Sequence, residues 1–95
     1  MKLQWTARAE LQLFEIADYI AADDPEAAIR WIERLRDRAR RAARMPRSGR
    51  RVPELGRDDI REVLEGAYRI VYRIEQRAIS VVAVFEGHHL LPELD

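Results

Sequence analysis

Two arginines and two histidines are the residues of this 95-residue chain whose types and spacing could support chemistry. Arg69 and Arg73 lie four residues apart in a stretch that alternates apolar and charged side chains, and His88 and His89 stand near the end of the chain. A planar guanidinium binds carboxylates and phosphates through paired hydrogen bonds. A histidine beside arginines could act as a general acid or base in RNA cleavage, while the arginines stabilise the charged phosphorane. Solvated side chains are the alternative interpretation for both pairs.

The sequence contains no other motif that is typical of catalysis. It has no cysteine, which excludes disulfides and thiolate chemistry, and its two histidines are not accompanied by carboxylates at the spacing of a zinc site. It has no glycine-rich phosphate loop, no Gly-x-Ser-x-Gly and no His-Glu-x-x-His. The carboxylate pairs Asp23-Asp24 and Asp58-Asp59 fall in predicted turns, where capping is their expected role. We therefore expect no metal and no cofactor.

Charge is balanced overall but unevenly distributed along the chain. The formal net charge is zero, and 16 of the 17 basic residues are arginine. Ten of these arginines lie between Arg30 and Arg51, where Glu33 and Asp37 are the only acidic residues, so this segment carries about +8 and the remainder about −8. Such asymmetry is typical of contact with an acidic partner or nucleic acid. A long helix with a solvated face, or the arginine-rich composition of a GC-rich genome, would produce the same pattern.

The alternating stretch Tyr68–Ile74 predicts a half-buried strand, because one face is apolar or aromatic and the other carries the arginines. Before it, the sequence predicts a short strand at Leu3–Trp5, a helix capped by Thr6, and a second helix at Pro25–Arg44. Apolar residues at helical spacing define the core side of each helix. They are Ala9, Leu13, Ile16, Ala17 and Ile20 in the first helix, and Ala28, Trp31, Ile32, Leu35, Ala39 and Ala42 in the second. A short turn between them predicts an antiparallel hairpin.

After a loop at Pro46–Gly56, three strand-like runs are joined by short turns, which predicts an antiparallel meander. The runs are Ile60–Leu64, Ala67–Glu75 and Ala78–Glu86. The last is apolar on both faces and is expected at the centre of the sheet. The predicted fold class is α+β, with a single domain over residues 1–95. It comprises an N-terminal strand, an α-helical hairpin and a three-stranded antiparallel meander packed on the two helices.

The helices should cover the Tyr/Ile face of the Tyr68–Ile74 strand and leave its arginine face open. Val82 and Val84 are expected beside the arginines there, so this open face is the predicted binding surface. The start of the chain has no apolar leader, and no apolar run approaches about 20 residues. We therefore expect a cytoplasmic protein without membrane contact.

Several short motifs occur in a fixed order along the chain. They are Trp5-Thr6, Tyr19-Ile20-Ala21, Asp24-Pro25-x-Ala27-Ala28, Pro46-x-x-Gly49-Arg50-x-Val52-Pro53-Glu54, Ile60-Arg61-Glu62, Tyr68-Arg69-Ile70-Val71-Tyr72 and Val84-Phe85-Glu86-Gly87-His88. In their order and spacing, over nearly the whole chain, the sequence resembles the RelE/ParE family of type II toxin–antitoxin toxins. The resemblance implies a bacterial toxin that is neutralised by a co-expressed ParD- or RelB-like antitoxin. Because the antitoxin binds the operator, the toxin would contact operator DNA only indirectly.

Two activities are known within that family: RelE-like members cleave mRNA on the ribosome, and ParE-like members poison DNA gyrase. The chain resembles the ParE-like members more closely. RelE-like members tend to be strongly basic and often carry a tyrosine near the C-terminus, whereas this chain is neutral, has one lysine and has no tyrosine after Tyr72. The Pro-x-x-Gly-Arg-x-Val-Pro-Glu loop also looks closer to ParE. The resemblance therefore implies a non-enzymatic gyrase inhibitor.

The resemblance assigns expected roles to individual residues. The residues expected to contact the target are Arg61, Arg69 and Arg73. The residues expected in the antitoxin groove are Leu11, Trp31 and Arg34. The alternative function is a ribosome-dependent endoribonuclease that uses Arg69, His88 and His89 as catalytic residues. A third hypothesis is a toxin-like fold that has lost toxicity and serves only as a binding partner.

Overall fold

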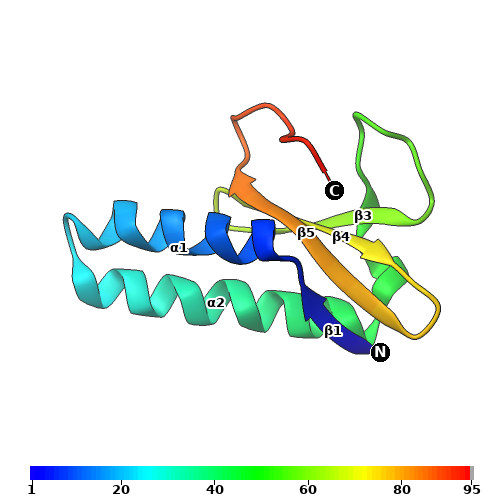
Figure 1. The fold of residues 1–95 in the computed structure, drawn as a ribbon, viewed down its shortest axis with the longest axis horizontal. Helices are drawn as coiled ribbons and strands as arrows, with labels where there is room; N and C mark the ends of the chain where they lie inside the picture. The colour runs from blue at the N-terminus through cyan, green and yellow to red at the C-terminus, as the bar shows by residue number, and fades with distance from the viewer. Residues whose placement is uncertain (95) are drawn as a thin grey trace.

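In the computed structural model, which describes residues 1–94, a helical hairpin packs on one face of a five-stranded sheet (Figure 1). The elements are β1 (Lys2–Trp5), α1 (Ala7–Ala21), α2 (Pro25–Arg44), the 3-10 helix η1 (Pro46–Ser48), β2 (Arg50–Arg51), β3 (Ile60–Glu65), β4 (Tyr68–Ile74) and β5 (Ala78–Glu86). The loop before β3 and the C-terminal segment lie on the other face of the sheet (Figure 1). The predicted α+β class is confirmed. No helix within residues 1–94 is long and apolar enough to cross a membrane.

Capping side chains set the start of both helices. The Thr6 hydroxyl oxygen accepts a hydrogen bond from the amide of Ala9 at 3.1 Å. The Asp24 carboxylate accepts from two first-turn amides of α2 at 3.1 and 3.2 Å. These acceptors satisfy amides that have no partner within the helix. The second helix has the predicted range, Pro25–Arg44, and ends there because Pro46 cannot continue it.

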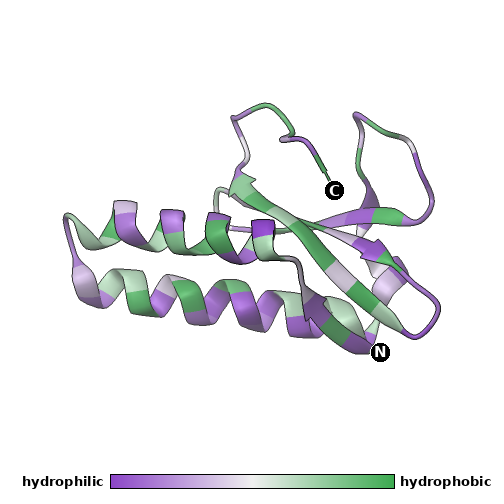
Figure 2. Ribbon diagram, in the orientation of Figure 1, coloured by the Kyte–Doolittle hydropathy of each residue, from purple (hydrophilic) through white to green (hydrophobic). Residues whose placement is uncertain are grey.

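The strand order is β1-β5-β4-β3-β2, with β1 parallel to β5 and the other neighbouring pairs antiparallel. Strand β5 is largely green in Figure 2 and lies between β1 and β4, so it is an interior strand, whereas β4 occupies the centre that was predicted for β5. The sequence does not predict β2, whose two arginines pair with Arg61 and Glu62 of β3. Two consecutive arginines among prolines and glycines carry no strand signal, so this segment is predicted only as part of a loop.

The main core lies between the helices and the sheet. Ile70 and Tyr72 of β4 are fully buried there with Leu13 of α1 and Leu35 of α2. The other two residues on this face of β4 are partly buried against the same cluster. The prediction that the Tyr/Ile face of β4 packs against the helices is therefore confirmed.

The arginine face of β4 is covered, so the prediction of an open face is wrong. Val71 of β4 and Phe85 of β5 belong to a second apolar cluster that also contains Val52 from the loop before β3. Leu91 and Leu94 of the C-terminal segment pack against this cluster. These covering residues are isolated in the sequence and show no periodicity, so no local pattern indicates that they fold back onto the sheet.

A bulge in β5 changes which residues reach that face. The register between β4 and β5 skips Val82, so this strand has one residue more than its partner at that point. Val82 and Ala83 consequently both lie in the second cluster, whereas Val84 lies in the helix-facing core. Of the two valines expected beside the arginines, the prediction is right for Val82 and wrong for Val84.

Replacing Leu35 by alanine should lower the free energy of unfolding by about 2–5 kcal/mol, because it leaves a cavity in the main core. Urea denaturation followed by circular dichroism measures the loss. Leu11→Ala is the matched control: its side chain is 60% exposed, and the change should stay within about 0.5 kcal/mol. Equal losses for the two variants would contradict the assignment of the core side of the hairpin.

Candidate functional site

The second face of the sheet is organised around the carboxylate of Glu62 in β3, whose side chain has an exposed fraction of 0%. Arg69 of β4 and Arg50 of β2 both donate hydrogen bonds to it, at 2.7 and 2.5 Å. Arg69 also donates two parallel hydrogen bonds to Glu54 in the loop, at 2.8 and 2.9 Å. A buried carboxylate is stable only with such partners. The four side chains therefore form one chain of ion pairs, which we call the Glu62 network.

The Glu62 network shifts the pKa values of Glu54 and Arg69. Hydrogen bonds from Arg69 lower the pKa of Glu54 to about 2. In turn, the carboxylates of Glu54 and Glu62 raise the pKa of Arg69 above its ordinary value. The Arg69 side chain is only 10% exposed, and its guanidinium lies 5.0 Å from the centre of the Phe85 ring. An arginine held in this way joins the loop to the sheet, and it would have to exchange its carboxylate partners before it could bind a phosphate.

The three arginines predicted to contact a target do not share one surface. Strand alternation places Arg61 on the helix-facing side of the sheet, and Arg69 and Arg73 on the opposite side. Arg61 donates to the Asp58 carboxylate at 2.7 Å and to the Gly49 carbonyl oxygen at 3.0 Å, and its side chain is 14% exposed. It therefore ties the loop to β3. For all three arginines, contact with a target stays a prediction.

The two histidines lie at the exposed start of the C-terminal segment. The Nδ1 atom of His88 is 2.6 Å from the Glu86 carboxylate, and this hydrogen bond lowers the pKa of Glu86. Gly87 packs against the aliphatic part of Arg69, since a Cβ atom there would lie 3.6 Å from Arg69 Cγ. The two histidines therefore follow in sequence a residue that contacts Arg69, while His89 lines a groove with α1. However, the guanidinium is directed into the Glu62 network and the His88 ring toward Glu86.

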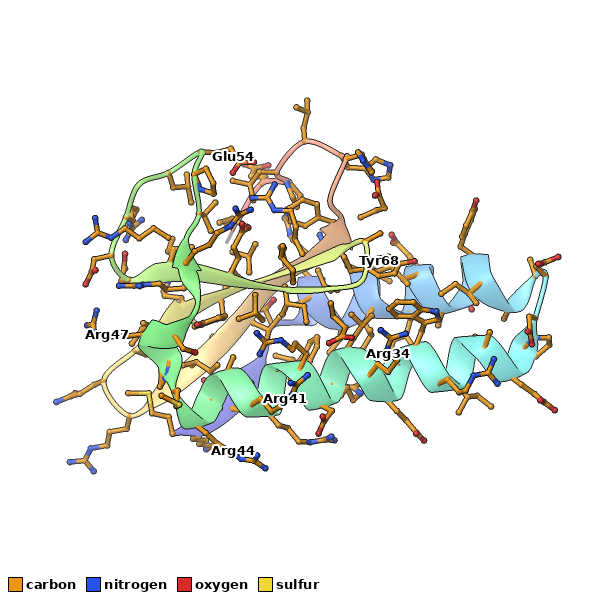
Figure 3. The ribbon with its side chains drawn as sticks, turned by 180° about the vertical axis from the view of Figure 1, so that it is seen from behind. Arg34, Arg41, Arg44, Arg47, Glu54 and Tyr68 are labelled. Atoms are coloured by element: carbon orange, nitrogen blue, oxygen red, sulfur yellow. The ribbon has the colours of Figure 1, made fainter. Side chains whose placement is uncertain are left out.

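Two of the three residues predicted for an antitoxin groove lie together. The guanidinium of Arg34 stacks 4.0 Å from the Trp31 ring and pairs with Glu65 of β3 at 2.7 Å. Trp31 meets Tyr68 edge to face, with ring centres 5.3 Å apart. Figure 3 shows Arg34 on α2 and Tyr68 at the adjoining start of β4. Leu11 lies on the exposed side of α1 instead, so the three residues do not form one patch.

A groove of about 620 Å³ separates α1 from the end of β5 and the C-terminal segment. Aromatic side chains from Tyr19 and Tyr68 and carboxylates from Glu15 and Glu86 line it. Within residues 1–94, no group of three or more histidine, aspartate or glutamate side chains is placed to hold a metal ion.

Sequence reasoning missed the acidic members of the Glu62 network. Glu62 has the same strand parity as Ile60, on the face of β3 that becomes buried. Leu64 is the register partner of Arg69, which places Glu62 diagonally opposite that arginine. A glutamate on the apolar side of a strand was therefore the sequence feature that could have indicated a buried carboxylate. Its pairing with Arg69 follows only from the β3–β4 register, which the turn between these strands sets.

Known proteins are similar to this chain over almost its full length, in sequence or in fold. The family model described as "ParE toxin of type II toxin-antitoxin system, parDE" matches residues 3–90. The chain is 35% identical over 98 residues to "Putative toxin Y4kP" of Sinorhizobium fredii (strain NBRC 101917 / NGR234), which covers 98% of this chain and 95% of that protein. In fold it is similar to a chain from the chromosomal ParDE TA system of P. aeruginosa, with a TM-score of 0.75 and 21% identity, covering 90% of this chain and 95% of the other.

Replacing Arg69 by methionine should lower the free energy of unfolding by about 1.5–3 kcal/mol, because the buried Glu62 would keep Arg50 but lose its hydrogen bond from Arg69. Urea denaturation at neutral pH measures this loss. Arg57→Met, the same change at an exposed ion pair, is the control and should cost less than about 1 kcal/mol. The double variant Glu62→Leu/Arg69→Met should recover much of the stability. A double variant as unstable as Arg69→Met alone would contradict this account.

Glu54 should couple stability to pH. Its pKa of about 2 in the folded chain lies below the ordinary value of 4.5, so its contribution is complete above about pH 4.5 and is lost as the pH falls toward 2. Glu54→Gln should therefore reduce the difference between the urea midpoints at pH 5 and pH 2.5. The Glu54 side chain is 41% exposed, so screening by solvent keeps the effect modest. Leu55→Ala is the control for a disturbance of the loop. If the urea midpoints of wild type and Glu54→Gln depend on pH in the same way, Glu54 does not couple stability to pH.

Proposed function

The chain belongs to the ParE family of toxins of type II toxin–antitoxin systems, and from that premise we propose that it inhibits DNA gyrase and is neutralised by a cognate antitoxin. Membership rests on the family model over residues 3–90 and on the 35% identity to a curated relative across 98% of the chain. Gyrase acts in the cytoplasm of bacteria, so the toxin acts there as well.

The state of Arg69 is the observation that supports inhibition by binding over RNA cleavage. A ribonuclease needs a cation that is available to the charge developing on the phosphate, and a base within reach of the attacking hydroxyl. Here the guanidinium of Arg69 is held by Glu54 and Glu62. Its transfer to a phosphate would leave the buried Glu62 with Arg50 alone of its two arginine partners, at a cost of about 1.5–3 kcal/mol.

The target-binding surface in this proposal uses the predicted arginines in two ways. Arg61 and Arg69 act as positioning residues, because both fix the loop between β2 and β3. Arg73, at the end of β4 where the loop enters β3, contacts the target from the same side of the sheet as Arg69. The proposal thus assigns the target contact to the loop and the adjoining end of β4.

The antitoxin occupies the helical hairpin in this proposal. Leu11, Phe14 and Ile29 are 60%, 51% and 60% exposed, which leaves large apolar side chains on the surface of both helices. Trp31 and Arg34 add an aromatic and a charged group on the side of α2 that borders β3. The similar structure from P. aeruginosa is of a ParDE system, which supports an antitoxin partner. Operator DNA is reached through that antitoxin.

A gyrase supercoiling assay with the purified chain tests the proposal. We expect a dose-dependent loss of supercoiling and accumulation of cleaved DNA, both reversed by an equimolar amount of the antitoxin. Arg73→Glu should inhibit at least tenfold more weakly, because it reverses the charge at the target contact. Arg40→Glu, the same change at an exposed arginine of α2 away from the loop and from β4, is the matched control and should inhibit like the wild type.

Translating ribosomes provide the second arm of the experiment, and the mRNA should stay intact there. Codon-phased cuts that disappear in His88→Ala or His89→Ala, with supercoiling unaffected, would replace the proposal by the endoribonuclease alternative. Inactivity in both assays together with tight antitoxin binding would instead support the third hypothesis, a toxin-like fold that has lost toxicity and only binds its antitoxin.

A further inference from the structure

The side of α2 that faces away from α1 carries a straight row of arginines. Arg30, Arg34, Arg41 and Arg44 recur at steps of four, seven and three residues, which places them on one side of a helix. We add Arg47 of η1, the next exposed arginine after α2, which lies off the line of Arg34, Arg41 and Arg44 in Figure 3. All five are exposed. At 1.5 Å per residue, the distance from Arg30 to Arg44 is about 21 Å. We call these five residues the arginine row.

The carboxylates near the arginine row do not neutralise it. Glu65 is shared by Arg34 and Arg41, at 2.7 and 3.4 Å. Asp58 is shared by Arg47 and two further arginines, at 2.6, 3.1 and 2.7 Å. Asp37, which lies in the row between Arg34 and Arg41, also pairs with Arg41 at 3.6 Å, so the uncompensated positive charge comes from Arg30, from Arg44 and from the sharing of Asp58 by Arg47. Within residues 1–94, the side chains of Arg30 and Arg44 have no hydrogen bond or ion pair.

The shared acids also hold the guanidinium groups in place. Arg34 is fixed between Glu65 and the face of the Trp31 ring, 4.0 Å from its centre. A side chain that is already ordered loses less conformational entropy when it binds. Planar guanidinium groups on a rigid helix match phosphate oxygens through paired hydrogen bonds.

We propose that the arginine row binds the phosphate backbone of duplex DNA, without reading its base sequence. Each strand of a duplex presents one phosphate per 3.4 Å of its axis, or about six over the length of the row, and the duplex is as straight as the helix on this scale. Only a polyanion of high charge density releases condensed counterions when it binds, and this release provides the driving force.

The aromatic residue beside the row argues against a single strand. Proteins that bind single-stranded nucleic acid stack the bases on exposed aromatic rings. Trp31 is the aromatic side chain next to the row, and its ring is covered by Arg34 on one side and packed against Tyr68. The row therefore offers contacts to phosphates and no platform for bases, which is the pattern of a backbone contact to a duplex.

Fluorescence anisotropy of a labelled 20-base-pair duplex, titrated with the full chain at 50–200 mM NaCl, tests the proposal. A dissociation constant of about 10⁻⁴ to 10⁻⁶ M is expected at physiological salt, and the logarithm of affinity should fall with the logarithm of salt at a slope of about −3 to −5 for three to five phosphate contacts. Arg30→Gln/Arg44→Gln should reduce the magnitude of that slope by about 2 and weaken binding at least tenfold at 50 mM NaCl.

Arg8→Gln/Arg57→Gln is the matched control, because it removes the same charge from α1 and from the loop before β3. Its slope and affinity should equal those of the wild type, with circular dichroism verifying that both double variants are folded. Equal weakening by the control would overturn the proposal in favour of a net-charge effect. Tighter binding of a single-stranded oligonucleotide, or equal binding of polyglutamate, would also overturn it. The binding assay contains no gyrase, so it tests the arginine row independently of the proposed inhibition of gyrase. A wild-type chain that inhibits gyrase but does not bind the duplex would reject the DNA-binding proposal and leave the gyrase proposal standing.

Discussion

A carboxylate without access to solvent is the constraint on which the rest of this structure depends. Glu62 lies in β3 with its side chain fully buried, and an unpaired charge there would cost several kcal/mol. Arg50 and Arg69 supply its partners from the strands on either side, and the remaining donors of Arg69 hold Glu54. The loop between β2 and β3 is therefore positioned by charge. The second apolar cluster forms once that loop is in place, because Val52 belongs to the loop.

The sequence predicts those parts of the fold whose signals are local. Capping residues and helical periodicity determine α1 and α2, and strict alternation determines which side of β4 faces the helices. The second face could not be predicted in the same way. The bulge at Val82 is a property of two paired strands, and Leu91 and Leu94 give no sign in the sequence of what they cover. The same limit applies to the site. Arg69 stands out on its strand, but its partner Glu62 is identified only by the register of the β3–β4 pair.

The arginines of this chain divide into two groups that composition alone cannot separate. Arg61 and Arg69, with side chains 14% and 10% exposed, are internal connections between strands and loop. The arginine row points outward; of the acids beside it, Glu65 and Asp58 are each shared by two or three guanidinium groups, and Asp37 pairs with Arg41. A net charge of zero therefore hides a surface that is basic on one side. Position in the fold, and not the residue type, separates arginines that stabilise the chain from those available to a partner.

This division limits which activities the fold can support in this chain. One sheet can carry many activities, so function must be argued from the particular side chains on it. On this sheet, the central arginine of the face that could act on RNA is already committed to stability. Catalysis there would require Arg69 to leave Glu62, so each turnover would disturb the contacts that hold the loop and the C-terminal segment. The proposed binding through the hairpin, the end of β4 and the arginine row would carry no such cost. The stability of the Glu62 network and the engagement of Arg69 by two carboxylates thus depend on the same buried side chain.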